Sequence, residues 1–208
     1  MNNAKKPDRD SYFHGWVYRK IIDPALVPLR EHVGWWIPDG STVVDIGCGT
    51  GAQLFALGKR IVRGLGVDHS RTQIEHAQQQ TCRLGLPHIE FLAADATHLT
   101  SIQDKEFDFA VTSLVIHEMP MEIRLPVLQE MRRIAGQLIV VDWRARQTTL
   151  WRRISTHAIE RLAGGEHYRG YRSFTKNGGI PQLLKQTDLT VVEEQETSKG
   201  TMQLWLCT

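Results

Sequence analysis

Three closely spaced glycines and a carboxylate could together hold a charged, nucleotide-like ligand. Gly47, Gly49 and Gly51 directly follow the apolar segment 42–46, and Asp45 lies inside that segment. Glycine permits a tight turn and lets the backbone approach a ligand closely. If a helix follows, its first N–H groups point toward the same ligand. The sequence therefore predicts a ligand-binding loop between a strand and a helix.

The glycine spacing fits two classes of cofactor. Gly47, Gly49 and Ala52 match the dinucleotide pattern G-x-G-x-x-G/A. Asp68 follows Gly49 at a separation of about 20 residues, where a carboxylate can accept hydrogen bonds from ribose hydroxyls. A nicotinamide dinucleotide and S-adenosylmethionine both carry such a ribose. These features alone leave an NAD(P)-dependent oxidoreductase open.

Two other carboxylates distinguish between the cofactors. Asp45 would repel a pyrophosphate, whereas it would attract the ammonium group of a methionine moiety. Asp95 follows the apolar segment 89–94, where it could accept the exocyclic amine of adenine. Both carboxylates favour S-adenosylmethionine over NAD(P).

The elements that must position these residues alternate along the chain. Apolar segments rich in Val and Ile predict buried parallel strands at 42–46, 61–67, 89–94, 107–114 and 137–142. Segments 190–194 and 202–206 flank a polar turn and predict an antiparallel hairpin. Helices are expected between the strands, for example from Ser70 to Leu84. The pattern predicts an α/β fold: a Rossmann-like, seven-stranded mixed sheet, mostly parallel with an antiparallel C-terminal hairpin, and helices on both faces.

The chain length suits one domain, because single cores grow to roughly 250–300 residues. Residues 1–36 are rich in apolar and aromatic side chains, and Pro24 and Pro28 interrupt them. We expect this segment to form short helices that pack beside the cofactor edge or over it as a lid. Residues 37–208 would form the S-adenosylmethionine-binding domain itself.

Motifs at the ends of three expected strands carry a family resemblance. These motifs are Val43–Gly51, Gly66–Ser70 and Ala94–Ala96. They resemble the first three motifs of the class I S-adenosylmethionine-dependent methyltransferases. The fourth expected strand and the terminal hairpin also match that family. Within it, the chain is similar to the small-molecule group that includes ubiquinone and menaquinone biosynthesis methyltransferases.

The resemblance implies a methyltransferase with S-adenosylmethionine as its cofactor, and it assigns site residues by position. The implied cofactor-binding residues lie at the ends of the first four strands: Asp45, Gly47, Cys48, Gly49, Gly51, Asp68, His69, Asp95, Ala96, Ser113 and Leu114. In this assignment Asp45 and the glycine loop hold the methionine end, and Asp68 binds the ribose hydroxyls.

The remaining assigned residues contact the two other parts of the cofactor. The resemblance implies that Asp95 and the backbone of Ala96 face adenine and that His69 flanks the adenine ring. It also implies that Ser113 and Leu114 line the sulfonium.

The acceptor side of the predicted site follows the fourth and fifth strands. His117 is the candidate general base, because an imidazole pKa near 6.5 suits proton transfer. The alternative is a histidine that orders the rim of the site by bonding a loop carbonyl. A sulfonium methyl is already activated, so a base is needed only where the acceptor must lose a proton.

The candidate acceptor-binding residues lie at the end of the fifth strand and in the basic segment 144–172: Trp143, Arg144, His167 and Tyr168. Arginines in this segment could pair with an anionic acceptor, and its rings could hold an aromatic one. The alternatives are a packed core tryptophan and a solvated basic face.

Composition narrows the class of protein. A formal net charge of +2 disfavours a nucleic acid as the partner. The 3 cysteines form no CxxC pair, so we expect no metal site. No apolar run approaches the roughly 20 residues that span a bilayer, so we expect a cytoplasmic protein without membrane insertion. A small-molecule acceptor is the predicted partner; a homodimer and a non-catalytic cofactor-binding protein stay open.

Overall fold

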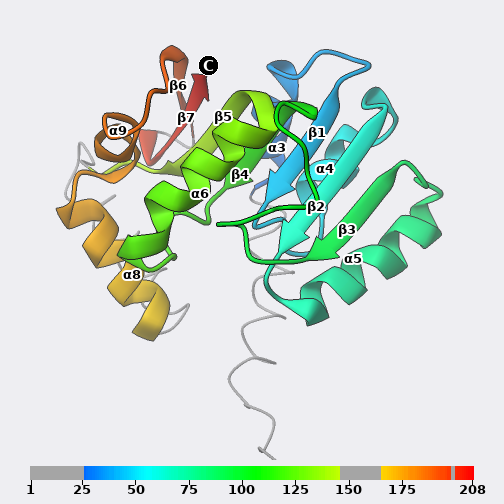
Figure 1. Ribbon diagram of the computed structural model, residues 1–208, viewed down its shortest axis with the longest axis horizontal. Helices are drawn as coiled ribbons and strands as arrows, with labels where there is room; N and C mark the ends of the chain where they lie inside the picture. Colours follow the sequence, from blue (N-terminus) through cyan, green and yellow to red (C-terminus); the bar gives the residue numbers. More distant parts are fainter. Residues whose placement is uncertain (1–25, 146–164, 198–199) are drawn as a thin grey trace, which may run out of the picture.

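The computed structural model describes residues 26–145, 165–197 and 200–208 (Figure 1). Strands and helices alternate along most of the chain. In order they are α3 (Val27–Trp35), β1 (Thr42–Ile46), α4 (Ala52–Leu57), the 3-10 helix η2 (Gly58–Arg60), β2 (Arg63–Asp68), α5 (Arg71–Leu84), β3 (Ile89–Ala93), β4 (Phe107–Ser113), α6 (Met121–Ile134), β5 (Ala135–Trp143), α8 (Gly165–Lys176), α9 (Gly179–Leu184), β6 (Val191–Thr197) and β7 (Met202–Cys207).

The strands form one 7-stranded sheet in the order β3-β2-β1-β4-β5-β7-β6. Strands β1 to β5 pair in parallel, whereas β7 runs antiparallel to both β5 and β6. The predicted mixed sheet with an antiparallel C-terminal hairpin is confirmed. Because the strand order reverses beside β1, the carboxyl ends of β1 and β4 border a crevice of the kind where open α/β sheets bind ligands.

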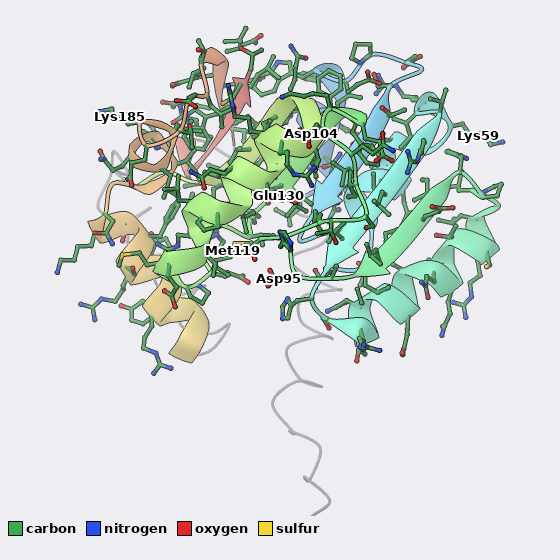
Figure 2. The ribbon with its side chains drawn as sticks, viewed as in Figure 1. Lys59, Asp95, Asp104, Met119, Glu130 and Lys185 are labelled. Atoms are coloured by element: carbon green, nitrogen blue, oxygen red, sulfur yellow. The ribbon has the colours of Figure 1, made fainter. Side chains whose placement is uncertain are left out.

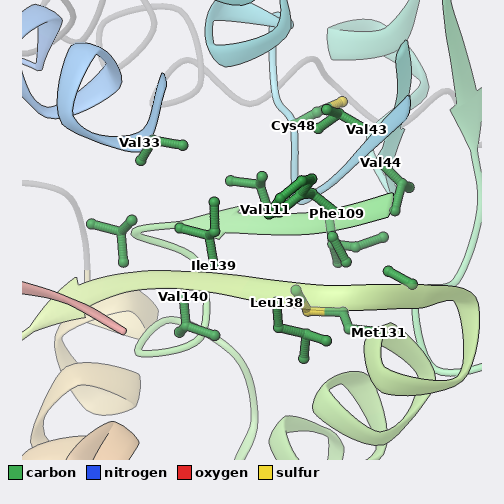
Figure 3. Close-up of a cluster of buried hydrophobic side chains, with 14 of the residues drawn as sticks. Val33, Val43, Val44, Cys48, Phe109, Val111, Met131, Leu138, Ile139 and Val140 are labelled. Atoms are coloured by element: carbon green, nitrogen blue, oxygen red, sulfur yellow. The ribbon is translucent and has the colours of Figure 1, made fainter. Parts of the chain in front are cut away.

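Helices cover both faces of the sheet, as predicted. Helix α6 crosses in front of the sheet in Figure 1, and α3 and α4 lie behind it. Figure 3 shows Val33 of α3 on one side of β4 and β5 and Met131 of α6 on the other. All the side chains of β5 from Leu138 to Val141 are completely buried, which is why this strand reads as a continuous apolar run.

Local sequence signals fix the ends of α5. The hydroxyl of Ser70 accepts a hydrogen bond from the Gln73 amide at 3.4 Å and so caps the first turn. Gly85 ends the helix in the left-handed conformation, with φ of 63°. The helix therefore starts shortly after β2, of which Asp68 is the last residue.

The described part of the N-terminal segment packs onto the rest of the chain. Leu29 and Val33 of α3 are buried in the same core as Val43 and Val44 of β1. Residues 1–25 lie outside the described residues, so the lid predicted for 1–36 stays a prediction. Among the described residues, no helix combines the length and apolar character needed to cross a membrane.

Candidate cofactor and acceptor site

The glycine loop is tied to the second strand by its backbone. The amides of Gly47 and Cys48 both donate to the Val67 carbonyl, at 2.8 and 3.1 Å. The Gly49 amide donates to Oδ2 of Asp68 at 2.9 Å. The loop is thus held at the carboxyl ends of β1 and β2 before any ligand binds.

The three glycines of the loop have different surroundings, although all have positive φ. A Cβ on Gly47 would lie 2.6 Å from Val115, and a Cβ on Gly51 would lie 2.4 Å from the Phe91 ring. At Gly49, no described atom lies within 4 Å of that position. The loop therefore packs against protein at its two ends and leaves open space at its centre, where a ligand could approach the backbone.

Cys48 is a packing residue within this loop. Its side chain is buried, and its sulfur would lie 2.8 Å from a Cβ on Gly66 of β2. Burial raises the pKa of the Cys48 thiol far above its usual range. The thiol therefore stays protonated and is no nucleophile at neutral pH.

Asp68 retains acceptor capacity for a ligand. One oxygen accepts the Gly49 amide, and the other accepts the Ser70 amide at 2.8 Å. Two carboxylate oxygens offer about four acceptor sites, so each keeps capacity for a ribose hydroxyl. His69 is almost fully exposed beside it, with Nδ1 3.4 Å from Oδ1 of Asp68.

Asp45 is a buried carboxyl within β1, two residues before the glycine loop. Its side chain is 3% exposed. Burial raises its pKa to about 7, the charge of Asp68 adds to this effect, and the positive charge of Arg30 in α3 opposes it. A ligand cation beside Asp45 would favour its ionised form, because an opposite charge stabilises a carboxylate.

Asp95 lies at the same edge of the sheet but is exposed. Figure 2 shows Asp95 and Met119 near the lower edge, toward which β1 to β3 point, and Lys59 and Asp104 toward the opposite end. Oδ1 of Asp95 accepts two hydrogen bonds from Thr97, through the amide at 2.9 Å and the hydroxyl at 2.8 Å. These bonds lower the pKa of Asp95 and leave its second oxygen for a ligand such as an amine. Ala96 is half-buried in the same turn.

Ser113 is the last residue of β4, and Leu114 follows it in the turn. The buried Oγ of Ser113 has no hydrogen-bond partner in the described part of the chain. Leu114 has φ of 59°, a conformation that costs an ordinary residue roughly 1–2 kcal/mol. Its amide donates to the Val141 carbonyl at 2.8 Å, which holds the turn in place. Strain of this kind clusters at functional sites.

His117 forms a buried pair with Asp142 of β5. Nδ1 of His117 lies 2.6 Å from Oδ1 of Asp142, and the His117 amide donates to Oδ2 at 3.1 Å. The side chains are 2% and 0% exposed. A carboxylate at Nδ1 favours a proton on that nitrogen, while Nε2 lies 3.7 Å from Oε1 of Glu118. The structure thus pairs the His117 ring with a carboxylate, and its role as a general base stays a prediction.

Three aromatic rings surround this histidine. Trp143, Tyr171 and Phe174 each meet the His117 ring edge-on, with centroids 6.2 to 6.3 Å away. All three are buried. Trp143 is therefore both a core residue and a neighbour of the candidate base.

Of the other three predicted acceptor-binding residues, Arg144 and Tyr168 have described side-chain contacts. Arg144 pairs with Glu196 of β6 at 2.5 Å. Tyr168 lies in α8, with the Arg172 guanidinium 5.9 Å from its ring centroid. His167 belongs to α8, but its side chain and most of the basic segment 144–172 lie outside the described residues.

The residues present fit S-adenosylmethionine. Within the described part of the chain, Gly49 leaves open space, Asp68 keeps acceptor capacity, and the buried Ser113 oxygen has no partner. Asp45 supplies a carboxyl that a cation would stabilise. These features match the methionine, ribose and sulfonium parts that the resemblance implies.

Three residues beside the site were not among the predicted functional residues: Asp142, Arg30 and Gln53. Gln53 is 5% exposed, and its amide donates to the Arg30 carbonyl at 3.4 Å, which joins α4 to α3. Asp142 had a readable signal, because it is an acid that follows the apolar run 138–141. Asp45 carries the same signal in β1. Nothing in the local sequence marks Arg30 or Gln53.

Comparisons with known proteins find methyltransferases. A model of a methyltransferase domain matches residues 43–137. The probable (S)-tetrahydroprotoberberine N-methyltransferase 2 of Papaver bracteatum is 29% identical over 65% of this chain and 36% of its own length. Indolepyruvate C-methyltransferase of Streptomyces griseus is 28% identical over 80% of this chain and 53% of its own. The chain thus spans about a third to a half of these relatives.

A solved structure shares the fold along nearly the whole chain. A SAM dependent methyltransferase from Aquifex aeolicus superposes with a TM-score of 0.67 at 19% identity, over 98% of this chain and 99% of that one. The likeness to ubiquinone and menaquinone biosynthesis enzymes is not confirmed by these relatives and stays a prediction. The methyltransferase-domain match over residues 43–137 and the shared sheet support a class I S-adenosylmethionine-dependent methyltransferase.

Proposed function

We propose that the chain transfers a methyl group to a small organic molecule whose acceptor atom loses a proton to His117. The observation that carries this proposal is the buried pair of His117 and Asp142 at 2.6 Å, which follows β4 at the cofactor edge. An oriented imidazole with Nε2 as acceptor is suited to general base catalysis.

S-adenosylmethionine, when bound, supplies an activated methyl group on a sulfonium. Asp45, the glycine loop and Asp68 would hold its methionine and ribose parts, and Asp95 and Ala96 would face its adenine. Ser113 and Leu114 would lie beside the sulfonium. Asp142 would keep the proton of His117 on Nδ1, and Nε2 would take the proton of the acceptor as its atom becomes a better nucleophile.

The surroundings of His117 support an acceptor that contains a ring. Trp143, Tyr171 and Phe174 form an apolar wall around the imidazole, and aromatic walls bind planar ligands by stacking and edge contacts. The related proteins named above act, by their names, on a tetrahydroprotoberberine and on indolepyruvate. Both support a small ring compound over a macromolecule for this chain.

The N-terminal segment 1–36 would complete the cofactor side as a packing segment beside residues 37–208. Helix α3 supports this part of the proposal. It brings the positive charge of Arg30 close enough to Asp45 to oppose the rise in the carboxyl pKa, and its backbone accepts a hydrogen bond from Gln53.

The test combines titration calorimetry with a transfer assay. We expect S-adenosylhomocysteine to bind and NADH not to bind; binding of NADH alone would contradict the proposal. Methyl-labelled S-adenosylmethionine is then incubated with phenols, hydroxyquinolines, secondary amines, 2-oxo acids and bulk tRNA. Label in a ring-containing small molecule supports the proposal, and label in tRNA opposes it. Cofactor binding without transfer to any acceptor favours a non-catalytic binding protein.

A further inference from the structure

Arg124 of α6 is a charged side chain buried in the protein interior. It is 2% exposed. Its guanidinium donates to three backbone carbonyls: Nε to Met119 at 3.0 Å, and Nη2 to His117 at 3.3 Å and to Gly170 at 2.9 Å. Burying a guanidinium is costly unless its donors are satisfied. An apolar side chain of similar size would pack here without the cost of desolvating a charge. The buried guanidinium therefore points to a role other than packing.

The three carbonyls belong to two separate parts of the chain. His117 and Met119 lie in the loop that connects β4 to α6, and Gly170 lies in α8, more than forty residues further along. One guanidinium thus joins this loop, 114–119, to α8. Its face also lies 5.6 Å from the ring centroid of Phe174, which is a second contact with α8.

Gly170 brings the α8 backbone into direct contact with the same loop. A Cβ at this position would lie 2.7 Å from the Glu118 carbonyl oxygen and 2.9 Å from that of His117. Both atoms are backbone, so they cannot move aside without displacing the loop. Only glycine therefore lets α8 approach closely enough for Arg124 to reach across.

The opposite end of the loop rests on the glycine loop of the cofactor site. Val115 fills the space beside Gly47, and the Leu114 amide bonds to the Val141 carbonyl of β5. These contacts do not involve Arg124 or α8. Loop 114–119 therefore has a cofactor-side anchor and a separate anchor at α8.

We propose that Arg124 is a positioning residue that, with Gly170, docks α8 against loop 114–119 and so places His117 for the acceptor, while the cofactor side is held independently. This inference rests on the proposed function of His117. The neighbouring rings of Tyr171 and Phe174 come from α8, so the same docking also assembles two walls around the imidazole.

The test uses amide hydrogen exchange, which needs no acceptor. In the native chain the amides of His117, Glu118 and Met119 are bonded to Asp142, Val115 and Ile116, and those of Gly47 and Cys48 to Val67. In Arg124→Met we expect exchange at 117–119 to speed up by at least about tenfold and exchange at 47–48 to stay unchanged. Affinity for S-adenosylhomocysteine should change by less than about threefold.

Three further variants keep the inference falsifiable if Arg124→Met folds poorly. Gly170→Ala should show the same local exchange pattern through steric displacement. Arg124→Lys should be intermediate, because an ammonium keeps the charge but cannot span three carbonyls in a fork. Arg132→Met is the matched control: Arg132 lies on the same helix, with one exposed bond to the Asp188 carbonyl, and exchange at 117–119 should stay native.

The kinetic readout separates this inference from the proposed function. With an acceptor in hand, Arg124→Met should lower kcat by about tenfold or more, while the cofactor KM stays within about threefold. Exchange that speeds up equally at 47–48, or native exchange and kcat in folded Arg124→Met, would overturn the positioning role. If exchange changes as expected but substitution of His117 leaves turnover intact, the proposed function fails and the docking stands.

Discussion

The Asp142 carboxylate contacts His117 twice: Oδ1 lies 2.6 Å from the ring nitrogen Nδ1 of His117, and Oδ2 accepts the His117 backbone amide at 3.1 Å. One carboxylate therefore contacts both the imidazole and the backbone of the loop that carries it. Asp142 itself is held in β5 between β4 and β7, and its Oδ1 also accepts the Trp143 amide at 2.7 Å. The candidate base is thus supported by a buried carboxylate on an interior strand of the sheet.

Replacing His117 tests its role as a base. In His117→Ala we expect turnover to fall by about 10²- to 10⁴-fold, because general base catalysis by a positioned side chain contributes an effect of this size. Affinity for S-adenosylhomocysteine should stay within about threefold of the native value. Turnover comes from labelled methyl transfer and affinity from calorimetry. His117→Gln, which still offers Asp142 a donor, controls for the buried carboxylate; native turnover in both variants would remove His117 as a base.

Replacing Asp142 tests the orientation of the ring. Asp142→Asn keeps the shape but can no longer hold the proton on Nδ1, so we expect turnover to drop at least about tenfold. Nitrogen NMR of the labelled imidazole should show a shift toward the other tautomer. Asp188→Asn, an exposed acid before β6, serves as the control. An unchanged tautomer together with lost turnover would mean that Asp142 acts in another way.

Asp45 should make cofactor binding depend on pH. Its pKa of about 7 means that the carboxyl is mostly neutral at pH 6 and mostly ionised at pH 8. The ligand ammonium prefers the ionised form, so affinity for S-adenosylhomocysteine should rise by about tenfold over this range. Binding at pH 7 should release protons, which calorimetry in two buffers of different ionisation enthalpy detects. Asp45→Asn should abolish both effects, and a flat profile in the native chain would refute the prediction.

The Asp45 carboxyl should also make the unliganded protein less stable as the pH rises, whereas cofactor affinity increases. A folded-state pKa above the unfolded value means that the native chain binds more protons between about pH 4 and 7. The unliganded protein should therefore lose stability as pH rises through this window. The change in urea midpoint between pH 5 and 8 should be smaller in Asp45→Asn than in the native chain; equal changes would argue against the raised pKa.

Alanine substitutions at two glycines of similar conformation can distinguish the effect of backbone strain from the effect of a contact with the ligand. Gly49 and Gly85 have φ of 52° and 63°, and no described atom lies within 4 Å of a Cβ on either. Each change to Ala should cost about 1–2 kcal/mol of stability. Only Gly49→Ala should also weaken S-adenosylhomocysteine binding, by about tenfold or more, because its methyl group enters the ligand space. Equal affinity in the two variants would place the cofactor elsewhere.

The fold was predictable because its signals are local. Runs of Val and Ile mark the buried strands, Ser70 and Gly85 mark the ends of α5, and the polar turn marks the hairpin. The glycine loop and Asp68 were predictable for the same reason, since a strand, a turn and a helix follow one another directly. Asp95 also follows the third strand as predicted, but its bonds to Thr97 form a local turn that no sequence pattern indicated.

The acceptor side depends on contacts between distant segments. The register of β4 on β5 brings the loop after Ser113 to Asp142, which is 25 residues from His117 in the sequence. Likewise, the carbonyl that Arg124 reaches in α8 is 46 residues away. Spacing and periodicity report on neighbours within one element, so they could name His117 but could not supply its partners.

The ring of Phe91 has a consequence for how such sequences can diverge. Its edge stands 2.4 Å from the Cβ positions of both Gly51, in the cofactor loop, and Gly66, in β2. The three positions therefore share one fixed volume. In relatives with the same backbone, a larger residue at either glycine should occur together with a smaller residue in place of the phenylalanine, so these sites should covary in size rather than drift independently.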